Sequence, residues 1–96
     1  MLLIITKGRL RRGASEPFKK AIKPFIEASR TDEGNISYEL FESVKNSDVV
    51  TFIARWEDET AFKKHNASPH FKQVVPKLLK FLRITKLEET TYKPVL

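Results

Sequence analysis

The chain has 96 residues, of which 41% are hydrophobic and 10% aromatic, and it contains no cysteine. Separate hydrophobic cores need roughly 100 residues each, so we expect residues 1–96 to form a single domain. The lack of cysteine excludes thiol nucleophiles, disulfides, iron–sulfur clusters and thiolate zinc sites.

The formal net charge is +6, but the charges are unevenly distributed along the chain. Residues 1–30 and 63–96 each carry eight basic and two acidic side chains, whereas residues 31–62 carry two basic and eight acidic ones. This pattern argues against a uniformly basic nucleic-acid tail. The apolar run Leu2 to Ile5 is shorter than the roughly 7 to 15 residues of a signal-peptide core, so we expect a cytoplasmic protein with no membrane partner.

The N-terminal third predicts a strand followed by a helix. Leu2 to Arg12 begins with β-branched residues and then alternates, as a strand does, and Gly13 ends it. Ser15 is the predicted helix N-cap, and Pro17 follows in the first turn. Pro24 removes one backbone hydrogen bond, so we expect a kink there within a single helix.

The helix is expected to stop before Gly34, and two strands joined by a hairpin turn follow it. The strands are Asn35 to Val44 and Val49 to Glu57, and residues 45–48 form the turn. One face of the first of these strands carries Ile36, Tyr38 and Leu40.

The last third predicts a helical unit broken in two and a final strand. Asp58 is the expected N-cap of a short helix, and Ser68 followed by Pro69 marks the start of a longer one. Pro76 should kink the longer helix without ending it. Ile84 to Val95, rich in threonine, is the predicted last strand.

The element order β-α-β-β-α-β is that of an α+β, ferredoxin-like fold with an antiparallel four-stranded sheet and helices on one face. The predicted strands are apolar on both faces, since Val49 and Ile53 oppose Val50 and Phe52. Helices cover only one face of such a sheet. We therefore expect a homodimer in which the other face packs against a second copy, as in dimeric α/β barrels.

Most sequence signatures of catalysis are missing. The chain has no glycine-rich phosphate loop, no dinucleotide fingerprint, no Gly-x-Ser-x-Gly elbow and no His-Glu-x-x-His motif. His65 and His70 are five residues apart with no acidic residue between them, which is a weak basis for a metal site, and we predict none. The acidic residues Glu57, Asp58 and Glu59 fit a strand end and a helix first turn.

Four local features, taken together, resemble one family. They are the strand end Arg55-Trp56-Glu57-Asp58, a helix ending in His65, the restart Ser68-Pro69-His70-Phe71, and an entry to the second strand of the form E-x-G-x-x-x-Y-E around residues 33–39. The chain resembles the antibiotic-biosynthesis monooxygenase (ABM) family over essentially its whole length. The resemblance implies a dimeric ferredoxin-like protein, and some members oxygenate quinols, anthrones or other polycyclic phenols without metal or flavin.

Such a reaction is compatible with the residues present. A deprotonated, electron-rich phenol supplies electrons to O₂ itself, so the protein must provide a dry aromatic pocket, a base and orientation, and we expect no cofactor. His65 is the candidate base. The candidate substrate-binding residues are Tyr38, Trp56, Phe62, His70 and Phe71.

Each candidate residue also has a purely structural interpretation. Trp56 at a strand end and Tyr38 on an apolar strand face are both compatible with core packing. His65 on the inner side of a short helix is compatible with a hydrogen-bonded structural histidine. His70, two residues after the Ser68 cap, is compatible with a helix start that contacts no ligand.

The same fold is compatible with other functions, which differ in the residues they require. An isomerase acting on a small hydroxy-ketone would use His65 as a proton shuttle, and a non-catalytic ligand-binding dimer would need no base. Haem-degrading relatives carry an Asn in the first strand, where this chain has Lys7 or Gly8, and a His in the last helix, where it has Gln73 to Val75. RNA-recognition modules need a third strand with glycines and several aromatics, and residues 49–55 have no glycine and one aromatic.

Overall fold

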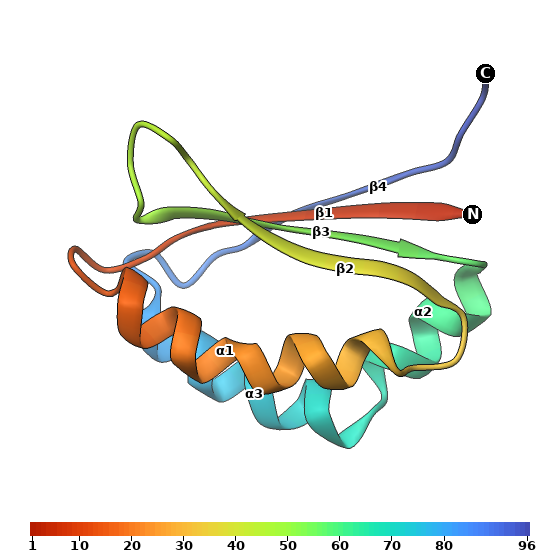
Figure 1. The fold of residues 1–96 in the computed structure, drawn as a ribbon, viewed down its shortest axis with the longest axis horizontal. Coiled ribbons are helices and arrows are strands. Elements are labelled where there is room, and N and C mark those ends of the chain that lie inside the picture. Colours follow the sequence, from red (N-terminus) through yellow and green to blue (C-terminus); the bar gives the residue numbers. More distant parts are fainter.

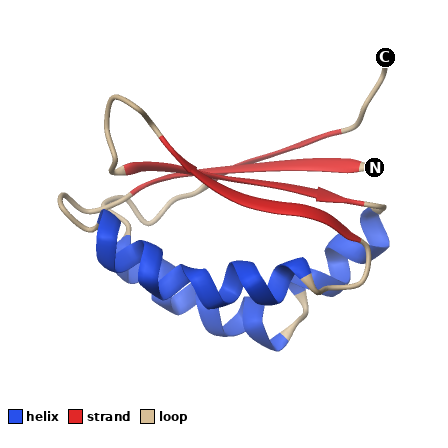
Figure 2. Cartoon of the chain, viewed as in Figure 1, coloured by secondary structure: helices blue, strands red, loops and turns tan.

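The chain folds into two layers, a four-stranded antiparallel sheet and a layer of helices that covers one face of it (Figure 1). The computed structural model describes all of residues 1–96. In chain order the elements are β1 (Leu2–Arg9), α1 (Ser15–Arg30), β2 (Asn35–Glu42), β3 (Val49–Trp56), α2 (Glu59–Asn66), α3 (Pro69–Phe81) and β4 (Glu88–Tyr92). All three helices lie on the same side of the sheet (Figure 2). The ferredoxin-like class is confirmed, and the second helical unit is divided into α2 and α3.

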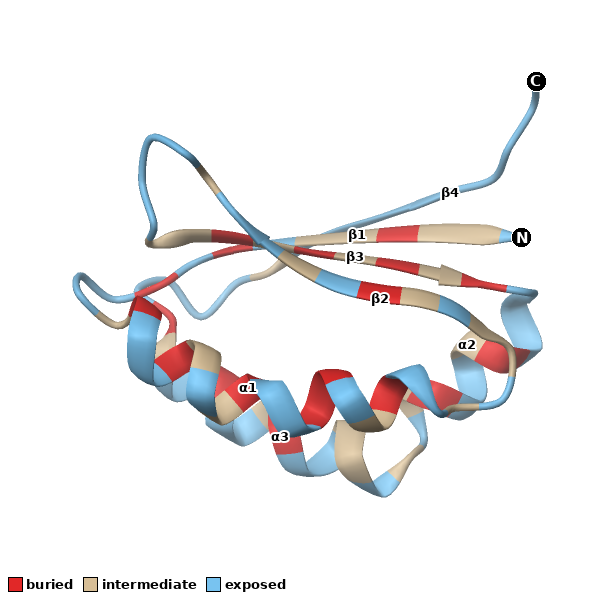
Figure 3. Ribbon diagram, viewed as in Figure 1, coloured by how far each residue is buried: buried red, intermediate tan, exposed pale blue.

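The strand order in the sheet is β2-β3-β1-β4. β1 and β3 form its centre and pair along their whole length, from Leu2 opposite Trp56 to Arg9 opposite Val49. Every second residue of β3 is buried against the helices, namely Val50, Phe52, Ala54 and Trp56. The residues between them face the other side of the sheet and are half-buried (Figure 3).

The apolar stripe of α1 closes the core from below the sheet. Phe18, Ile22, Phe25 and Ile26 are all buried, at the three- and four-residue spacing that places side chains on one helical face. α1 continues through Pro24 and α3 through Pro76, so each proline stays within a single helix, as the sequence predicts.

Near the N-terminus, the predicted end of β1 and the predicted N-cap of α1 are both wrong. β1 stops at Arg9 instead of Arg12, because the Arg11 N–H bonds to the Phe81 carbonyl at the end of α3 rather than to a strand. Ser15 is the first helical residue and not the N-cap. The cap is Ala14, whose carbonyl already accepts the Phe18 N–H, and the buried Ser15 hydroxyl has no partner.

The last strand is shorter than predicted, covering Glu88–Tyr92 instead of Ile84 to Val95. The chain reverses direction after α3, and the Arg83 N–H bonds to the Arg9 carbonyl, so the residues around Ile84 are used in the turn. At the other end Tyr92 already pairs with Leu3, and β1 begins one residue before that. Beyond Tyr92, β1 has only Leu2 left as a partner, so β4 cannot continue to Val95.

A bulge interrupts the regular alternation of β2. Asn35 pairs with Trp56 and Ser37 with the adjacent Arg55, so Ile36 is the extra residue. The predicted common face of Ile36 with Tyr38 and Leu40 is therefore wrong, since Ile36 is exposed while Tyr38 is buried. The bulge does not displace Tyr38, which points into the core.

Gly34 sets how closely the loop before β2 approaches α2. Its φ is +80°, a left-handed conformation, and its carbonyl accepts the Glu57 N–H at 2.8 Å. A Cβ at this position would overlap the Cβ of Ala61 in α2. Only glycine therefore allows the loop to lie directly against the first turns of α2.

The two left-handed glycines make a matched test of this contact. Gly13 has a φ of +76° but open space around it. We expect Gly13→Ala and Gly34→Ala each to cost about 1–2 kcal/mol through the backbone conformation, and the overlap with Ala61 to add about 1–3 kcal/mol at Gly34 alone. Urea unfolding of both variants measures the difference. Equal costs at the two positions would contradict a tight contact between loop and α2.

Candidate functional site

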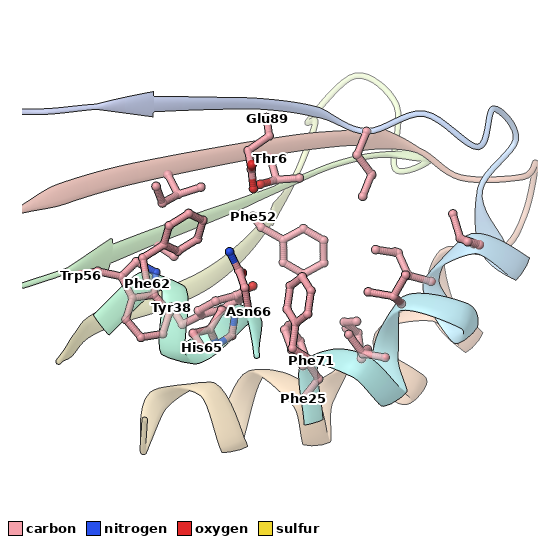
Figure 4. A pocket seen from close by; sticks show the side chains of 18 residues that line it. Thr6, Phe25, Tyr38, Phe52, Trp56, Phe62, His65, Asn66, Phe71 and Glu89 are labelled. Atoms are coloured by element: carbon pink, nitrogen blue, oxygen red, sulfur yellow. The ribbon is translucent and has the colours of Figure 1, made fainter. Parts of the chain in front are cut away.

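A cavity of about 120 Å³ lies between the inner face of the sheet and the helices, and it is partly open to solvent. It is lined by 18 residues, 14 of them hydrophobic. Five of the residues predicted from the sequence line it together (Figure 4), namely Tyr38, Trp56, Phe62, His65 and Phe71. They come from β2, β3, α2 and α3, so the cavity forms only when all four elements are in place.

His65 reaches the cavity because of where α2 begins. The Asp58 side chain accepts the Ala61 N–H at 2.8 Å, which confirms the predicted N-cap. From this start, Ala61 and His65 lie four residues apart on the buried face of the helix. The His65 side chain is 2% exposed. Its ring centre lies 4.6 Å from that of Trp56, which ends β3 as predicted.

The start of α3 places Phe71 and His70. The Ser68 hydroxyl accepts the Phe71 N–H at 3.2 Å, so the predicted cap is confirmed, with Pro69 as the first helical residue. Phe71 turns towards the cavity, and its ring centre is 5.3 Å from that of His65. His70 does not line this cavity; it lies on the outer side, in a shallow groove between α1 and α3.

One residue of the site was not found from the sequence. Asp32, in the loop between α1 and β2, accepts a hydrogen bond from His65 Nδ1 and another from His70 Nε2, both at 2.8 Å and both on the same oxygen, Oδ2. The E-x-G-x-x-x-Y-E pattern places an acidic residue two positions before Gly34, and in this sequence that residue is Asp32. Glu33 is exposed and pairs with Lys64 at 3.6 Å.

The protonation state of His65 follows from two opposing effects. Burial lowers its pKa below the ordinary value of 6.5, and the hydrogen bond and negative charge of Asp32 partly offset this. His65 is therefore neutral at neutral pH. Because a carboxylate only accepts hydrogen bonds, the ring proton resides on Nδ1, and the lone pair on Nε2 is left for a molecule in the cavity.

The Tyr38 hydroxyl and the Trp56 indole N–H are two further polar groups of the cavity wall, and both carry a proton. Burial, with smaller contributions from the charges of Glu89 and Asp32, raises the pKa of Tyr38 well above its ordinary value, so its hydroxyl keeps its proton. The indole Nε1 of Trp56 is buried and has no hydrogen-bond partner. An unpaired buried donor costs about 1–3 kcal/mol, so an acceptor atom of a bound molecule would be favoured beside it.

The cluster of Asp32, His65 and His70 was also considered as a metal site, since one donor atom from each lies within 4.8 Å of the others. Zinc needs imidazole nitrogens and carboxylate oxygens at about 2.0–2.2 Å, all directed to one central point. Here both ring nitrogens are directed at the same oxygen at hydrogen-bond distance. The arrangement is that of a hydrogen-bonded group.

The mouth of the cavity lies between α3 and β4. Of the lining residues, Leu79 on α3 and Glu89 on β4 are exposed, whereas those from α1, β2 and β3 are buried. Glu89 lies opposite Thr6 of β1, so these two polar lining residues are on this side, whereas His65 and Asn66 are on α2. A bound molecule would thus have its inner end at the aromatic wall and its outer end near Glu89.

Comparison with known proteins establishes the family. A family model described as "Antibiotic biosynthesis monooxygenase" (ABM) matches residues 1–77. The chain belongs to the ABM family. This is a monooxygenase-type family, and the resemblance seen in the sequence is confirmed.

Individual relatives agree with the ABM assignment. The chain is 37% identical over 62 residues to a Bacillus subtilis (strain 168) protein named "Putative monooxygenase YcnE"; the match covers 65% of each protein. It is 32% identical, also over 62 residues, to the Synechocystis protein sll1783, of which it covers 42%. The matched segment thus spans less than two thirds of the length of either relative.

Solved structures share the ABM fold over nearly the whole chain. A conserved protein from Methanosarcina mazei Go1 superposes with a TM-score of 0.90 at 26% identity, covering 96% of this chain and 90% of that one. A structure described as an antibiotic biosynthesis monooxygenase gives 0.92 at 24% identity, with both chains fully covered. No helix of this ABM chain is both long and apolar enough to cross a membrane.

The lowered pKa of His65 gives the stability of this ABM protein a defined pH dependence. The unfolded chain takes up a proton on this histidine near pH 6.5, whereas the folded chain does so only at lower pH. The unfolded state therefore binds more protons within this window, and the free energy of unfolding should fall as the pH drops below about 6.5. Urea unfolding between pH 8 and pH 5 measures this.

His65→Asn is the matched control for that measurement. The asparagine amide reaches about as far as Nδ1 and still donates to Asp32, but it does not titrate. The part of the pH dependence that belongs to His65 should be missing in this variant. Identical curves for the two proteins would show that His65 titrates normally in the folded state.

Proposed function

We propose that this chain, acting as one domain over residues 1–96, is a monooxygenase that oxidises a quinol or polycyclic phenol with O₂ and uses no metal, flavin or other cofactor. The observation that carries the proposal is the position of His65, a neutral histidine with one ring nitrogen available, inside a cavity with aromatic walls. Membership of a monooxygenase-type family supports the same class of reaction.

The chemistry requires only the groups that surround this cavity. His65 Nε2 accepts the phenolic proton, and the resulting phenolate is electron-rich enough to donate electrons to O₂. For a quinol with a free ring C–H, the substrate supplies all the electrons: one oxygen atom enters the product as a hydroxyl on the quinone, and the other leaves as water. The apolar lining limits competing proton transfer from solvent.

The size of the cavity and the unpaired Trp56 donor limit the kinds of substrate that the site would accept. A cavity of about 150 Å³ holds a benzene ring, so the space of about 120 Å³ here fits one aromatic ring with slight adjustment. The oxygen-bearing ring would occupy this space, and a small movement of the wall would let the Trp56 indole N–H, which is buried and unpaired in the free chain, donate to its oxygen. Any further rings would extend towards the mouth between Leu79 and Glu89.

His65→Ala should lower turnover by about 10²- to 10⁴-fold while substrate binding is largely kept, because that is the usual contribution of a general base. Trp56→Phe removes the indole donor together with part of the ring volume, so it should weaken binding of a quinol more than binding of the parent hydrocarbon. Oxygen consumption by the metal-free protein with a panel of naphthoquinols and anthrones, and fluorescence binding with the hydrocarbons, provide the measurements.

Lys63→Ala is the control for the histidine variant, since Lys63 is on the exposed side of the same helix and pairs with Glu59. In the wild type, activity should be lost on the acidic side at a pH below 6.5, because burial lowers the pKa of His65. Full oxygen uptake by the His65→Ala protein would refute the assignment of the base. Substrate isomerisation without oxygen uptake would instead support the isomerase hypothesis.

We further propose that the protein is a homodimer joined through the sheet face opposite the helices. On that face Ile5 lies opposite Ile53, and Leu3 lies opposite Tyr92. Phe41 and Tyr92 are 47% and 51% exposed in the single chain. Charged residues lie among them, since Glu39 pairs with Ile53 and Arg55 with Leu3. Exposed apolar side chains on a sheet face without helices over it are typical of an interface between copies.

Ile53→Asp should convert the dimer to a monomer or unfold it, because an unpaired carboxylate would then be buried between two sheets. Ser47→Asp, in the exposed turn between β2 and β3, introduces the same charge away from that face and should leave the dimer intact. Light scattering at micromolar concentration gives the mass of both variants. A monomeric wild-type protein would refute the proposed assembly.

A further inference from the structure

Asp32 and His70 lie outside the cavity, and neither is needed for an aromatic binding pocket. We propose that they are positioning residues for the cavity histidine: Asp32 holds the Nδ1 proton of His65 so that Nε2 faces the cavity as a base, and His70 holds Asp32 in place and moderates its charge. The inference rests on the proposed function for its catalytic meaning, but its structural part can be tested without a substrate.

The three side chains come from separate parts of the chain. Asp32 lies 33 residues before His65 and 38 before His70, and the three meet where the α1–β2 loop, the end of α2 and the start of α3 come together. The backbone of Asp32 is fixed on both sides, since its N–H bonds to the Ser29 carbonyl and its carbonyl accepts the Asn35 N–H, each at 3.1 Å. The carboxylate is thus held by the fold before any ligand binds.

The geometry at Oδ2 determines which nitrogen of His65 is the base. A neutral imidazole has one donor and one acceptor nitrogen, and the carboxylate takes the donor. His65 Nδ1 lies 2.8 Å from Oδ2, so Nδ1 carries the proton. When Nε2 then accepts a second proton, the negative charge of Asp32 stabilises the imidazolium, as a carboxylate bonded to the far nitrogen does for a metal-bound histidine.

His70 bonds to the same oxygen of Asp32 as His65 does, so the two histidines compete for the negative charge of that carboxylate. Its Nε2 lies 2.8 Å from Oδ2, and its side chain is 25% exposed, whereas that of His65 is 2% exposed. A proton on His70 neutralises much of the negative charge on Asp32 and so lowers the proton affinity of His65. This is the direction in which His70 shifts the pKa of His65.

Few other charged groups act on His65. From β2 it faces Tyr38, which stays neutral, and from α1 and β3 it faces the rings of Phe25 and Trp56. From α3 it faces Phe71 and His70. Glu89 on β4 lines the same cavity. The pair Lys64 and Glu33 lies on the exposed side of the same region. Asp32 and His70 are the two titratable groups that a shared carboxylate oxygen joins to its ring.

The first test is nitrogen NMR of the ¹⁵N-labelled wild-type protein, which shows which ring nitrogen carries the proton. We expect His65 as the Nδ1–H form at neutral pH, and a predominant Nε2–H form would overturn the inference. In Asp32→Asn the preference for Nδ1–H should be reduced and the pKa of His65 should fall further, because the carboxylate that raises it is gone.

His70→Gln separates the role of His70 from that of Asp32. The glutamine amide reaches about as far as Nε2, so it still donates to Asp32 but cannot be protonated. The Nδ1–H form of His65 should be kept, and its pKa should rise because a competing positive charge is removed. An unchanged pKa would overturn the moderating role of His70. This variant also serves if Asp32→Asn does not fold.

Glu33→Gln is the matched control, because it removes one negative charge at the adjacent position without touching either histidine. With a working quinol, Asp32→Asn should lower kcat by about 10- to 100-fold, the usual effect of losing a supporting carboxylate. KM should change little, and the acidic limb of the pH profile should move to lower pH. Glu33→Gln should show none of these changes.

The results also separate this inference from the proposed function. If Asp32→Asn changes the proton position and pKa of His65 while His65→Ala keeps full oxygen uptake, the positioning is correct and the proposed function is wrong. If His65→Ala loses turnover while Asp32→Asn keeps the wild-type proton position, pKa and kcat, the function stands and this inference is wrong.

Discussion

The burial of a histidine among aromatic rings is the constraint on which this molecule's site depends. A ring that is 2% exposed cannot exchange its hydrogen bonds with water, so at least one of its nitrogens needs a partner inside the protein. Asp32 supplies that partner from a loop, and His70 shares it from the next helix. One carboxylate oxygen therefore links the α1–β2 loop to both α2 and α3 inside the protein, in addition to the exposed pair of Lys64 and Glu33 between the loop and α2.

Gly34 makes that link sterically possible. Asp32 reaches His65 only because the loop lies directly against α2, and the contact with Ala61 leaves no room for a side chain at Gly34. The same loop then enters β2, where the bulge at Ile36 restores the direction in which Tyr38 points into the core. The left-handed conformation of Gly34, its close contact with Ala61 and the bulge at Ile36 thus together set the positions of the Asp32 carboxylate and the Tyr38 ring.

The sequence predicted those parts of the fold that depend on local patterns. Asp58 and Ser68 were identified as helix caps because capping requires only a side chain and an N–H three residues on. The aromatic cavity was also predicted from local patterns, because Trp56 lies at the end of its strand and Phe71 lies just after the start of a helix. Asp32 was missed because its hydrogen bonds join residues more than 30 positions apart, and nothing in periodicity or capping reports such a contact. The length of β4 was also wrong, because it is set by where its partner β1 begins.

The short edge strand beside the mouth bears on how a ligand enters. β4 has five residues, all exposed, and pairs with β1 alone, while the aromatic wall at the other end of the cavity is held by buried residues of β2 and β3. Exposed edge hydrogen bonds open at lower free energy than those of a core. Fraying of β4 would thus widen the entrance by breaking a few hydrogen bonds, and amide exchange would be fast along Glu88–Tyr92 while it remained slow in β3. The two ends of the cavity thus differ in mobility: β4 at the entrance can move to admit a ligand, while His65 and Asp32 at the inner end stay fixed.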